Sequence, residues 1–268
     1  MDAVALGPFV IPLDRLFTVL ALAGFLSTAE VMSRRLKEPL WSAWAWNATA
    51  AGLVIARVGY VAGHWPVFRE NPASIFYIWQ GGFSPLWGVL GGLLYSVWLF
   101  RRQSLELRLA LWPAAAGFLV AAALFSLASV RVPAQAELPD LVLPTLSGAA
   151  RNLADFKGQP VVLNVWATWC PPCRREMSML AEAEAANPGI AFVFVNTGES
   201  AGQVQGFLDR QGLFFNHALL DPGRLLVPRL NVIGFPTTFF FNREGALVAR
   251  KTGELSRASL EDLLARIR

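Results

Sequence analysis

The chain has 268 residues, of which 54% are hydrophobic and 16% are charged. A soluble domain usually has about 25% charged residues, so part of this chain is expected to lie in lipid. The formal charge of +4 belongs to residues 1–132, which carry 10 Lys and Arg against 6 Asp and Glu, whereas residues 133–268 carry 13 of each. These charges flank apolar segments and form no basic patch of the kind that binds nucleic acid, so no nucleic-acid partner is expected.

Four apolar segments occupy the first half of the chain. They cover residues 16–32, 41–63, 85–100 and 109–130. Each is close to the length of about 17–25 residues that a membrane helix needs. The third is short, and the aromatic segment 75–83 before it is expected at the membrane interface, so an interpretation with three spans stays open. The sequence therefore predicts an all-α membrane domain over residues 1–132 with about four spans.

The loops between these segments predict the orientation of the chain. The first and third loops are basic, whereas the second is close to neutral: Arg34, Arg35 and Lys37; Arg101, Arg102 and Arg108; His64, Arg69 and Glu70. Because basic loops face the cytoplasm, both termini are expected outside. The first segment is not expected to be a cleaved signal peptide, because its leading residues lack Lys and Arg and include Asp2 and Asp14. We therefore expect a multi-pass membrane protein whose second half lies outside the cytoplasm.

The second half of the chain has the pattern of an α/β domain. A short linker rich in Pro and Ala, 131–139, leads into it. Buried strands are predicted at 161–166 and 190–196, helices at 172–186, 202–212 and 256–268, and a hairpin of two strands at 237–242 and 247–252. Strands that alternate with helices predict a parallel core with an antiparallel hairpin at one edge. This second domain is expected to cover residues 133–268.

Both cysteines of the chain lie in one motif, Cys170-Pro171-Pro172-Cys173, between a predicted buried strand and a predicted helix. The first turn of a helix has unpaired N–H groups and the positive end of the macrodipole, so a thiolate there is stabilised and its pKa is expected below about 8.5. Cys170, at the exposed end, is expected to attack a partner's disulfide, and Cys173 to resolve the mixed disulfide.

The alternatives for this motif are half of a zinc site or a structural disulfide. A chain with only two cysteines has neither a multi-disulfide framework nor a four-cysteine zinc site. No metal site is expected, and no cofactor besides the redox-active Cys170–Cys173 disulfide itself.

A second motif, Gly234-Phe235-Pro236-Thr237, precedes the predicted hairpin. Proline is tolerated at the start of a strand, and a cis peptide bond there would present backbone to a substrate strand. Together with 138–140, 155–158, 162–173 and 195–200, this motif makes residues 137–268 resemble the TlpA/ResA family of extracytoplasmic thioredoxin-like proteins. The resemblance implies a thioredoxin fold, Cys170 as nucleophile, Cys173 as resolving thiol and Pro236 as a cis-proline.

The resemblance also bears on two polar residues near the cysteines. General thioredoxins carry a buried Asp six residues before the first cysteine, and Asn164 occupies that position. In the TlpA/ResA branch a Glu three residues after the second cysteine tunes the thiols, and Glu176 matches it. Because helix positions three apart share a face, Glu176 could exchange a proton with Cys173. The alternative is a solvated carboxylate in the first turn. The Pro-x-x-x-Thr-x-x-Cys motif of peroxiredoxins does not fit, because Leu163 and Ala167 stand at its Pro and Thr positions.

The first half resembles prolipoprotein diacylglyceryl transferase over 56–60, 71–72 and 78–84. In that enzyme a histidine soon follows the Gly-Gly pair, whereas Leu86 stands after Gly81-Gly82-Phe83-Ser84-Pro85, and the later catalytic arginine motif has no counterpart. Arg57 lies inside a predicted span, where it could bind a lipid head group, snorkel or pair with Glu30. His64 and His217 are interpreted as ordinary surface or interface residues.

The sequence thus predicts a membrane-anchored extracytoplasmic thiol:disulfide oxidoreductase. The family implies a reductase at the periplasmic face of a bacterial inner membrane, whose targets include oxidised cysteine pairs such as those of apocytochrome c, in cytochrome c maturation. Its electrons are expected from a separate membrane donor, because the membrane half has no thiol. The alternatives are a thiol oxidant on the same scaffold, or a lipid-binding or lipid-modifying membrane protein with an accessory redox domain.

Overall fold

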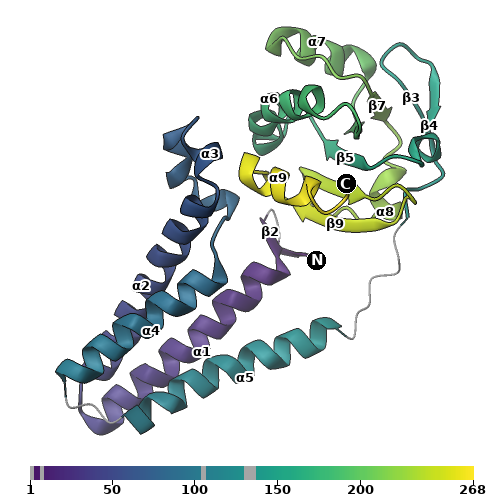
Figure 1. Cartoon of the computed structure of the whole chain (residues 1–268). Helices are drawn as coiled ribbons and strands as arrows, with labels where there is room; N and C mark the ends of the chain where they lie inside the picture. Colours follow the sequence, from purple (N-terminus) through teal and green to yellow (C-terminus); the bar gives the residue numbers. More distant parts are fainter. Residues whose placement is uncertain (1–2, 7–8, 104–106, 130–136) are drawn as a thin grey trace. The chain divides into compact units, whose positions relative to one another are not determined.

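A computed structural model of the chain describes residues 3–6, 9–103, 107–129 and 137–268 (Figure 1). The chain divides into two compact units. One is Leu13–Val132, and the other combines Met1–Pro12 with Pro133–Arg268. The predicted linker 131–139 lies outside the described residues as far as residue 136.

The first unit is helical, as the sequence predicts. Its long helices are α1 (Leu13–Leu36), α2 (Leu40–Gly63), α4 (Pro85–Arg102) and α5 (Leu107–Ser129). Short helical turns connect α2 to α4, namely α3 (Trp65–Phe68), η1 (Pro72–Phe76) and η2 (Ile78–Gln80). The long helices approach closely at glycines. A Cβ on Gly52 would lie 3.0 Å from the carbonyl oxygen of Gly88, and one on Gly117 would lie 3.2 Å from that of Ala21. Small residues of this kind are typical of helix contacts in membranes.

Only part of this unit meets a simple criterion for membrane spans. Among the described residues, one helix stretch, Arg15–Leu36, is long and apolar enough to cross a membrane by length and composition, and a shorter apolar stretch covers Arg108–Leu124. Asn47 and Arg57, together with Gly and Trp, lower the mean hydropathy of α2, and α4 ends in Arg101 and Arg102. The helical fold is therefore confirmed, whereas the number of about four membrane spans stays a prediction.

The second unit is built on a five-stranded sheet with the order β7-β6-β5-β8-β9. Its strands are β5 (Val161–Trp166), β6 (Ala191–Thr197), β7 (Ala218–Asp221), β8 (Thr237–Phe241) and β9 (Leu247–Thr252). β5, β6 and β7 are parallel, whereas β8 and β9 are antiparallel to their neighbours. This is the predicted parallel core with a hairpin at one edge.

Helices cover both faces of the sheet (Figure 1). Side chains of α6 (Pro171–Ala186), α7 (Ala201–Gln211) and α9 (Arg257–Leu264) pack on one face around Trp166 and Phe240. The other face packs against η3 (Leu153–Phe156), α8 (Leu226–Arg229) and the hairpin of β3 (Val142–Pro144) and β4 (Ala150–Asn152). This arrangement of β5, α6, β6, β8, β9 and α9 confirms the expected thioredoxin-like α/β fold.

Every residue of β5 is buried, and its side chains alternate between the two faces. Val161, Leu163 and Val165 join the core under η3, whereas Val162 and Trp166 join the core under α6. Asn164 follows the second set, so its amide lies in the apolar core beneath α6 with an exposure of 1%. The strand thereby carries a polar group to the helix that holds the cysteines.

Candidate active site

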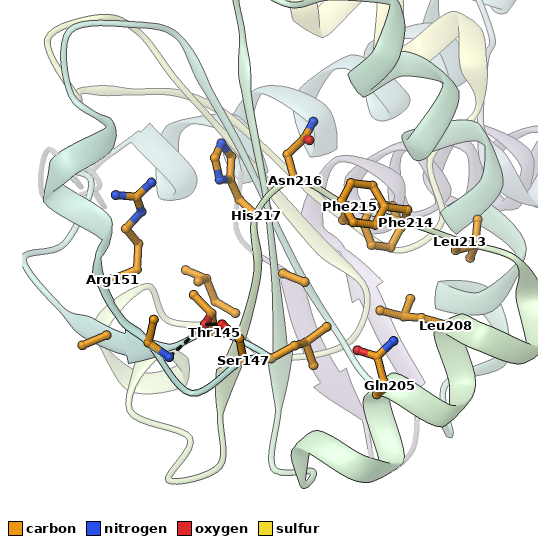
Figure 2. A pocket seen from close by; sticks show the side chains of 15 residues that line it. Thr145, Ser147, Arg151, Gln205, Leu208, Leu213, Phe214, Phe215, Asn216 and His217 are labelled. Atoms are coloured by element: carbon orange, nitrogen blue, oxygen red, sulfur yellow. Dashed lines mark hydrogen bonds between the residues drawn. The ribbon is translucent and has the colours of Figure 1, made fainter.

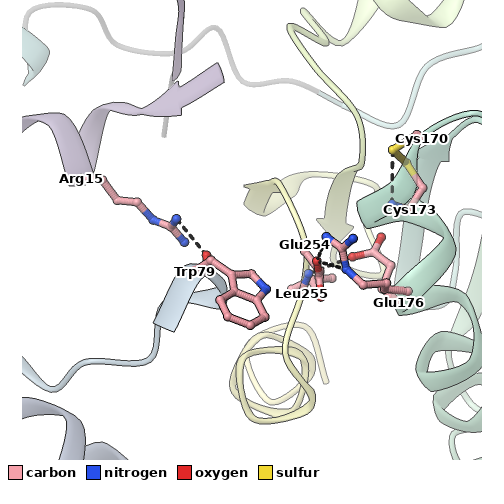
Figure 3. A network of polar contacts seen from close by, with 8 residues as sticks. Arg15, Trp79, Cys170, Cys173, Glu176, Glu254 and Leu255 are labelled. Carbon is pink, nitrogen blue, oxygen red and sulfur yellow. Dashed lines mark hydrogen bonds and ion pairs between the residues drawn. A yellow bond between two sulfur atoms is a disulfide. The ribbon is translucent and has the colours of Figure 1, made fainter. Parts of the chain in front are cut away.

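The two cysteines form a disulfide at the start of α6 (Figure 3). β5 ends at Trp166, and Cys170 is the N-cap residue of α6, with Pro171 and Pro172 in the first turn. Prolines are tolerated there because the first N–H groups of a helix have no intrahelical partner. The Cys170 sulfur accepts a hydrogen bond from the backbone N–H of Cys173 at 3.2 Å. A negative charge on this sulfur would therefore meet an oriented N–H and the positive end of the helix.

Both sulfurs are shielded in the disulfide form, which differs from the expectation of an exposed Cys170. Cys170 is 3% exposed and Cys173 is 0% exposed. The neighbouring Trp169 is 62% exposed, and its ring makes an edge contact with Phe235 at 5.8 Å between centroids. The order of exposure follows the prediction, but the difference between the two residues is small.

Pro236 lies at the same end of the sheet as the cysteines. The Phe235–Pro236 peptide bond is cis. β8 begins at the next residue and pairs directly with β5, where Thr237 lies opposite Val165. Because β5 runs towards the cysteine motif, this register places the cis-proline loop beside the end of β5. The carbonyl of Pro236 accepts a hydrogen bond from Gly253 and so ties this loop to the end of β9.

Glu176 is buried, so the interpretation as a solvated first-turn carboxylate is wrong. It is 2% exposed. One carboxyl oxygen accepts a hydrogen bond from the side-chain amide of Asn164 at 2.9 Å. The other accepts one from the backbone N–H of Leu255 at 2.8 Å, and Figure 3 shows Glu176 near Leu255. Asn164 also donates to the hydroxyl of Thr238 at 2.9 Å. The strand β5, the helix α6 and the segment before α9 thus meet at this carboxyl group, and Asn164 links it to β8.

Burial decides the protonation of Glu176. Loss of solvent favours the neutral acid, whereas the hydrogen bonds from Leu255 and Asn164 favour the carboxylate. The first effect is larger, and the pKa of Glu176 is raised to about 8. At neutral pH the group is therefore mainly a neutral acid, placed one helical turn behind Cys173 and on the same face of α6.

A second buried carboxylate, Glu199, holds the loop that leads to Cys170. It accepts hydrogen bonds from the backbone N–H of Thr168 at 2.7 Å, from the Thr168 hydroxyl, and from the side-chain amide of Asn196 at 2.8 Å. No role for this residue was predicted from the sequence. The available signal was its position directly after a buried strand and before the serine cap of the next helix, Ser200.

The two histidines lie away from the disulfide. His217 precedes β7, at the opposite end of the parallel strands, where it stacks edge-on against Phe156 at 4.8 Å and lines a cavity of about 580 Å³ (Figure 2). Burial, aided by the nearby Arg151, lowers the pKa of His217. His64 ends α2, with Nδ1 3.0 Å from the carbonyl oxygen of Tyr60. Within the described residues, no cluster of three or more His, Cys, Asp or Glu could hold a metal ion.

Arg57 does not pair with Glu30, in contrast to one of the expectations from the sequence. Glu30 instead accepts from Arg34 at 2.8 Å and from Ser42 at 2.7 Å. Arg57 donates four hydrogen bonds to backbone carbonyls of the segment between α2 and α4. A guanidinium has five N–H groups, so little capacity remains for a lipid phosphate.

Comparisons with known proteins identify the two halves separately. Residues 133–264 match the Redoxin family, and residues 2–134 match prolipoprotein diacylglyceryl transferase. The thiol-disulfide oxidoreductase ResA of Bacillus subtilis is 35% identical over 130 residues, which are 48% of this chain and 72% of that protein. The chain belongs to the ResA family of thiol-disulfide oxidoreductases. ResA of Geobacillus kaustophilus is also 35% identical, over 48% of this chain and 75% of its own length.

Among solved structures, a secreted Mycobacterium tuberculosis disulfide oxidoreductase is 33% identical, with a TM-score of 0.43, over 47% of this chain and 95% of its own length. The ResA relatives show that the chain is an enzyme of the thiol-disulfide oxidoreductase class. Its second half carries the ResA likeness, and its first half adds a segment similar to a lipid-modifying enzyme.

Proposed function

We propose that this protein is a membrane-anchored reductase of protein disulfides that acts outside the cytoplasm through Cys170 and Cys173. The observation that carries the proposal is the disulfide at the N-terminus of α6 with the buried Glu176 one turn behind it. A structural disulfide needs neither the helix N-terminus at the first sulfur nor a buried ionisable group behind the second. The separate loop that carries Pro236 lies beside the end of β5 and offers backbone to an extended substrate there.

The reaction begins with the reduced enzyme. The Cys170 thiolate attacks one sulfur of the target disulfide, which releases the other target sulfur as a thiolate and forms a mixed disulfide. Cys173 then loses its proton and attacks the Cys170 sulfur, so the target leaves with its second thiol. Two electrons pass from the enzyme to the target, and Cys170 and Cys173 end as the disulfide that the structure holds.

Glu176 is proposed as the group that receives the Cys173 proton. In its carboxylate form it can accept that proton as Cys173 attacks, and the product is then a neutral acid. The pKa of about 8 in the disulfide form matches this product state at neutral pH. The same carboxyl would return the proton when a donor reduces the disulfide again.

The helical unit is proposed as the anchor. Its helices expose large apolar side chains to the surroundings, among them Leu86 at 68%, Leu94 at 69%, Trp112 at 70% and Phe118 at 72%. Small residues such as Gly52 and Gly117 lie where the helices approach most closely. Outward apolar faces around small-residue contacts suit lipid better than water. We therefore propose about four spans, with the basic first and third loops in the cytoplasm and the redox unit on the periplasmic side.

Two partners follow from this proposal. The chain has only two cysteines, so a separate membrane protein must supply electrons through its own thiols. The likeness to the TlpA/ResA branch supports oxidised cysteine pairs of apocytochrome c as targets. Lipid transfer by the first half is not favoured, because Leu86 stands near the position of the histidine in the transferase and Arg57 is engaged by backbone carbonyls.

Trapping of the mixed disulfide tests the proposal. In Cys173→Ser the second step is blocked, so a covalent complex of Cys170 with its target should accumulate in cells that make c-type cytochromes. It should appear on non-reducing gels and disappear with dithiothreitol. The matched control, Cys170→Ser, should trap little, because the helix N-terminus and the backbone N–H of Cys173 favour a thiolate at Cys170. Mass spectrometry would name the target. Equal absence of adducts in both variants would contradict the proposed order of attack.

A further inference from the structure

The segment 64–84 connects α2 to α4, and hydrogen bonds and contacts fix where its end lies along the axis of α2. The backbone N–H of Ser84 donates to the carbonyl of Ala56 at 3.0 Å, and Gly59 lies against Trp87. α4 therefore starts level with residue 56, although α2 continues to Gly63. At 1.5 Å per residue, the last seven residues of α2 extend about 10 Å beyond the start of α4. The end of segment 64–84 fills the space beside this last part of α2.

Two arginines satisfy the backbone of this non-helical segment. Arg57 donates to the carbonyl oxygens of Ile75 at 2.9 Å, Ser74 at 3.0 Å, and Gly81 and Gly82 at 2.8 Å. Arg15 donates to the carbonyl of Trp79 at 3.0 Å (Figure 3). Many loops in water leave such carbonyls to the solvent. Five carbonyls bound by guanidinium groups indicate a segment built for surroundings that offer few hydrogen bonds.

Gly82 and two aromatic rings also enclose the guanidinium group of Arg57. Gly82 has a φ of +81°, and a Cβ there would lie 2.7 Å from a guanidinium nitrogen of Arg57. The guanidinium also lies over the rings of Phe68 at 5.4 Å and Phe83 at 5.7 Å. The charge of Arg57 is therefore enclosed by carbonyls and aromatic faces.

The outward side chains of the segment are apolar and aromatic. Phe76 is 77% exposed, Ile78 61%, Trp65 54% and Trp79 53%, and the ring of Trp79 stacks on that of Tyr77 at 4.8 Å. In the same segment, arginine side chains thus bind the backbone carbonyls, and aromatic side chains are exposed. Trp and Tyr are enriched where a membrane helix leaves the hydrocarbon region.

We infer that segment 64–84 is a membrane-interface element that lies in the outer head-group layer of the bilayer, with Arg57 as the positioning residue that holds its backbone. The inference rests on the proposed membrane anchor, because the position of the segment in the bilayer is derived from the positions of α2 and α4. α4 has 18 residues, or about 27 Å, close to the hydrocarbon thickness of about 30 Å, so its start at Pro85 marks the outer boundary of that region. The exposed aromatic side chains of this segment therefore contact lipid.

Spin labels on the full-length chain in phosphatidylcholine vesicles test this inference. In a Cys170→Ser/Cys173→Ser background, single cysteines replace Phe76 or Ile78, Leu94 in the middle of α4, or Phe214 in the redox unit. Collision rates of each label with oxygen, which enters lipid, and with a water-soluble nickel chelate are compared. The ratio of oxygen to nickel rates should be highest at 94, severalfold lower but still raised at 76 and 78, and lowest at 214.

The outcomes separate the inference from the proposed anchor. If 76 and 78 match 214 while 94 remains in lipid, the interface element is overturned and the anchor stands. If 94 also matches 214, the anchor itself is contradicted. Arg57→Gln should increase both the mobility and the nickel accessibility of labels at 76 and 78. The control Arg69→Gln, which removes the same charge from an exposed position of the segment, should leave both unchanged. Unchanged labels in Arg57→Gln would overturn the role of Arg57.

Discussion

Replacement of Glu176 by Gln should remove a large pH dependence from the stability of the redox unit. In the folded disulfide form the pKa of Glu176 is raised to about 8 from its ordinary value of 4.5, chiefly by burial. The folded state therefore binds more protons than the unfolded state between these two values. Under linkage, the stability from the buried neutral acid is fully present below about pH 4.5 and is lost as the pH rises to about 8.

The size of the effect follows from the same two values. Each pH unit inside the window changes the free energy of unfolding by at most about 1.4 kcal/mol. The whole window from 4.5 to about 8 gives an upper limit of about 5 kcal/mol, and the range from pH 5 to pH 8 gives about 4 kcal/mol. Gln has nearly the shape of the neutral acid but does not titrate. The wild type should therefore lose stability relative to Glu176→Gln as the pH rises, and the two curves should converge in slope above about pH 8.

Hydrogen exchange measures the pH dependence of this stability within the full-length oxidised chain. The slowest amides of β5 and β8 report the free energy of unfolding of the redox unit, after correction for the intrinsic pH dependence of exchange. The matched control is Glu182→Gln, which changes an exposed carboxylate on the same helix that pairs with Arg257. It should keep the wild-type slope. Parallel pH curves for wild type and Glu176→Gln would refute the conclusion that burial dominates at this carboxyl group.

The remaining predictions concern the thiols and the topology. In the reduced enzyme, Glu176→Gln should displace the curve of thiol alkylation rate against pH, because a titrating neighbour of Cys173 is lost; superimposable curves would leave Glu176 without a role in the chemistry. Alkaline phosphatase fused near residue 104 should be inactive and the same fusion after Arg268 active, because the basic third loop is expected in the cytoplasm. The reverse pattern of activity would overturn the proposed orientation.

The sequence predicted the redox fold closely where buried strands and helix caps leave clear signals. The strands at 161–166 and 247–252 have the predicted bounds, and α6 begins at Pro171, one residue before the predicted start. The long helices of the first unit also match their apolar segments to within four residues at each end. β7 and α8 were missed. Each has only four residues, too few for a periodic pattern. The N-terminal hairpin of β1 (Ala3–Leu6) and β2 (Phe9–Pro12) was missed for the same reason.

The residues of the candidate site could be predicted from the sequence, but their burial and hydrogen-bond partners could not. Spacing alone leads from Cys173 to Glu176, but whether that carboxyl is solvated depends on Asn164 and Leu255, which are 12 and 79 residues away in the chain. The burial of Cys170 depends on the packing of the chain around it, and the partners of Arg57 are backbone carbonyls, which no side-chain pattern reveals. Long-range contacts of this kind decide protonation and exposure, so they had to come from the structure.

The reduction potential of the Cys170–Cys173 pair, measured in the full-length chain by equilibration with defined dithiothreitol buffers, tests the reductase assignment most directly. A reductase of protein disulfides should have a potential near the value of about −270 mV for thioredoxin, so that electrons flow from Cys170 and Cys173 to the target. A potential near the value of about −120 mV for DsbA would contradict this direction and identify the same scaffold as a thiol oxidant.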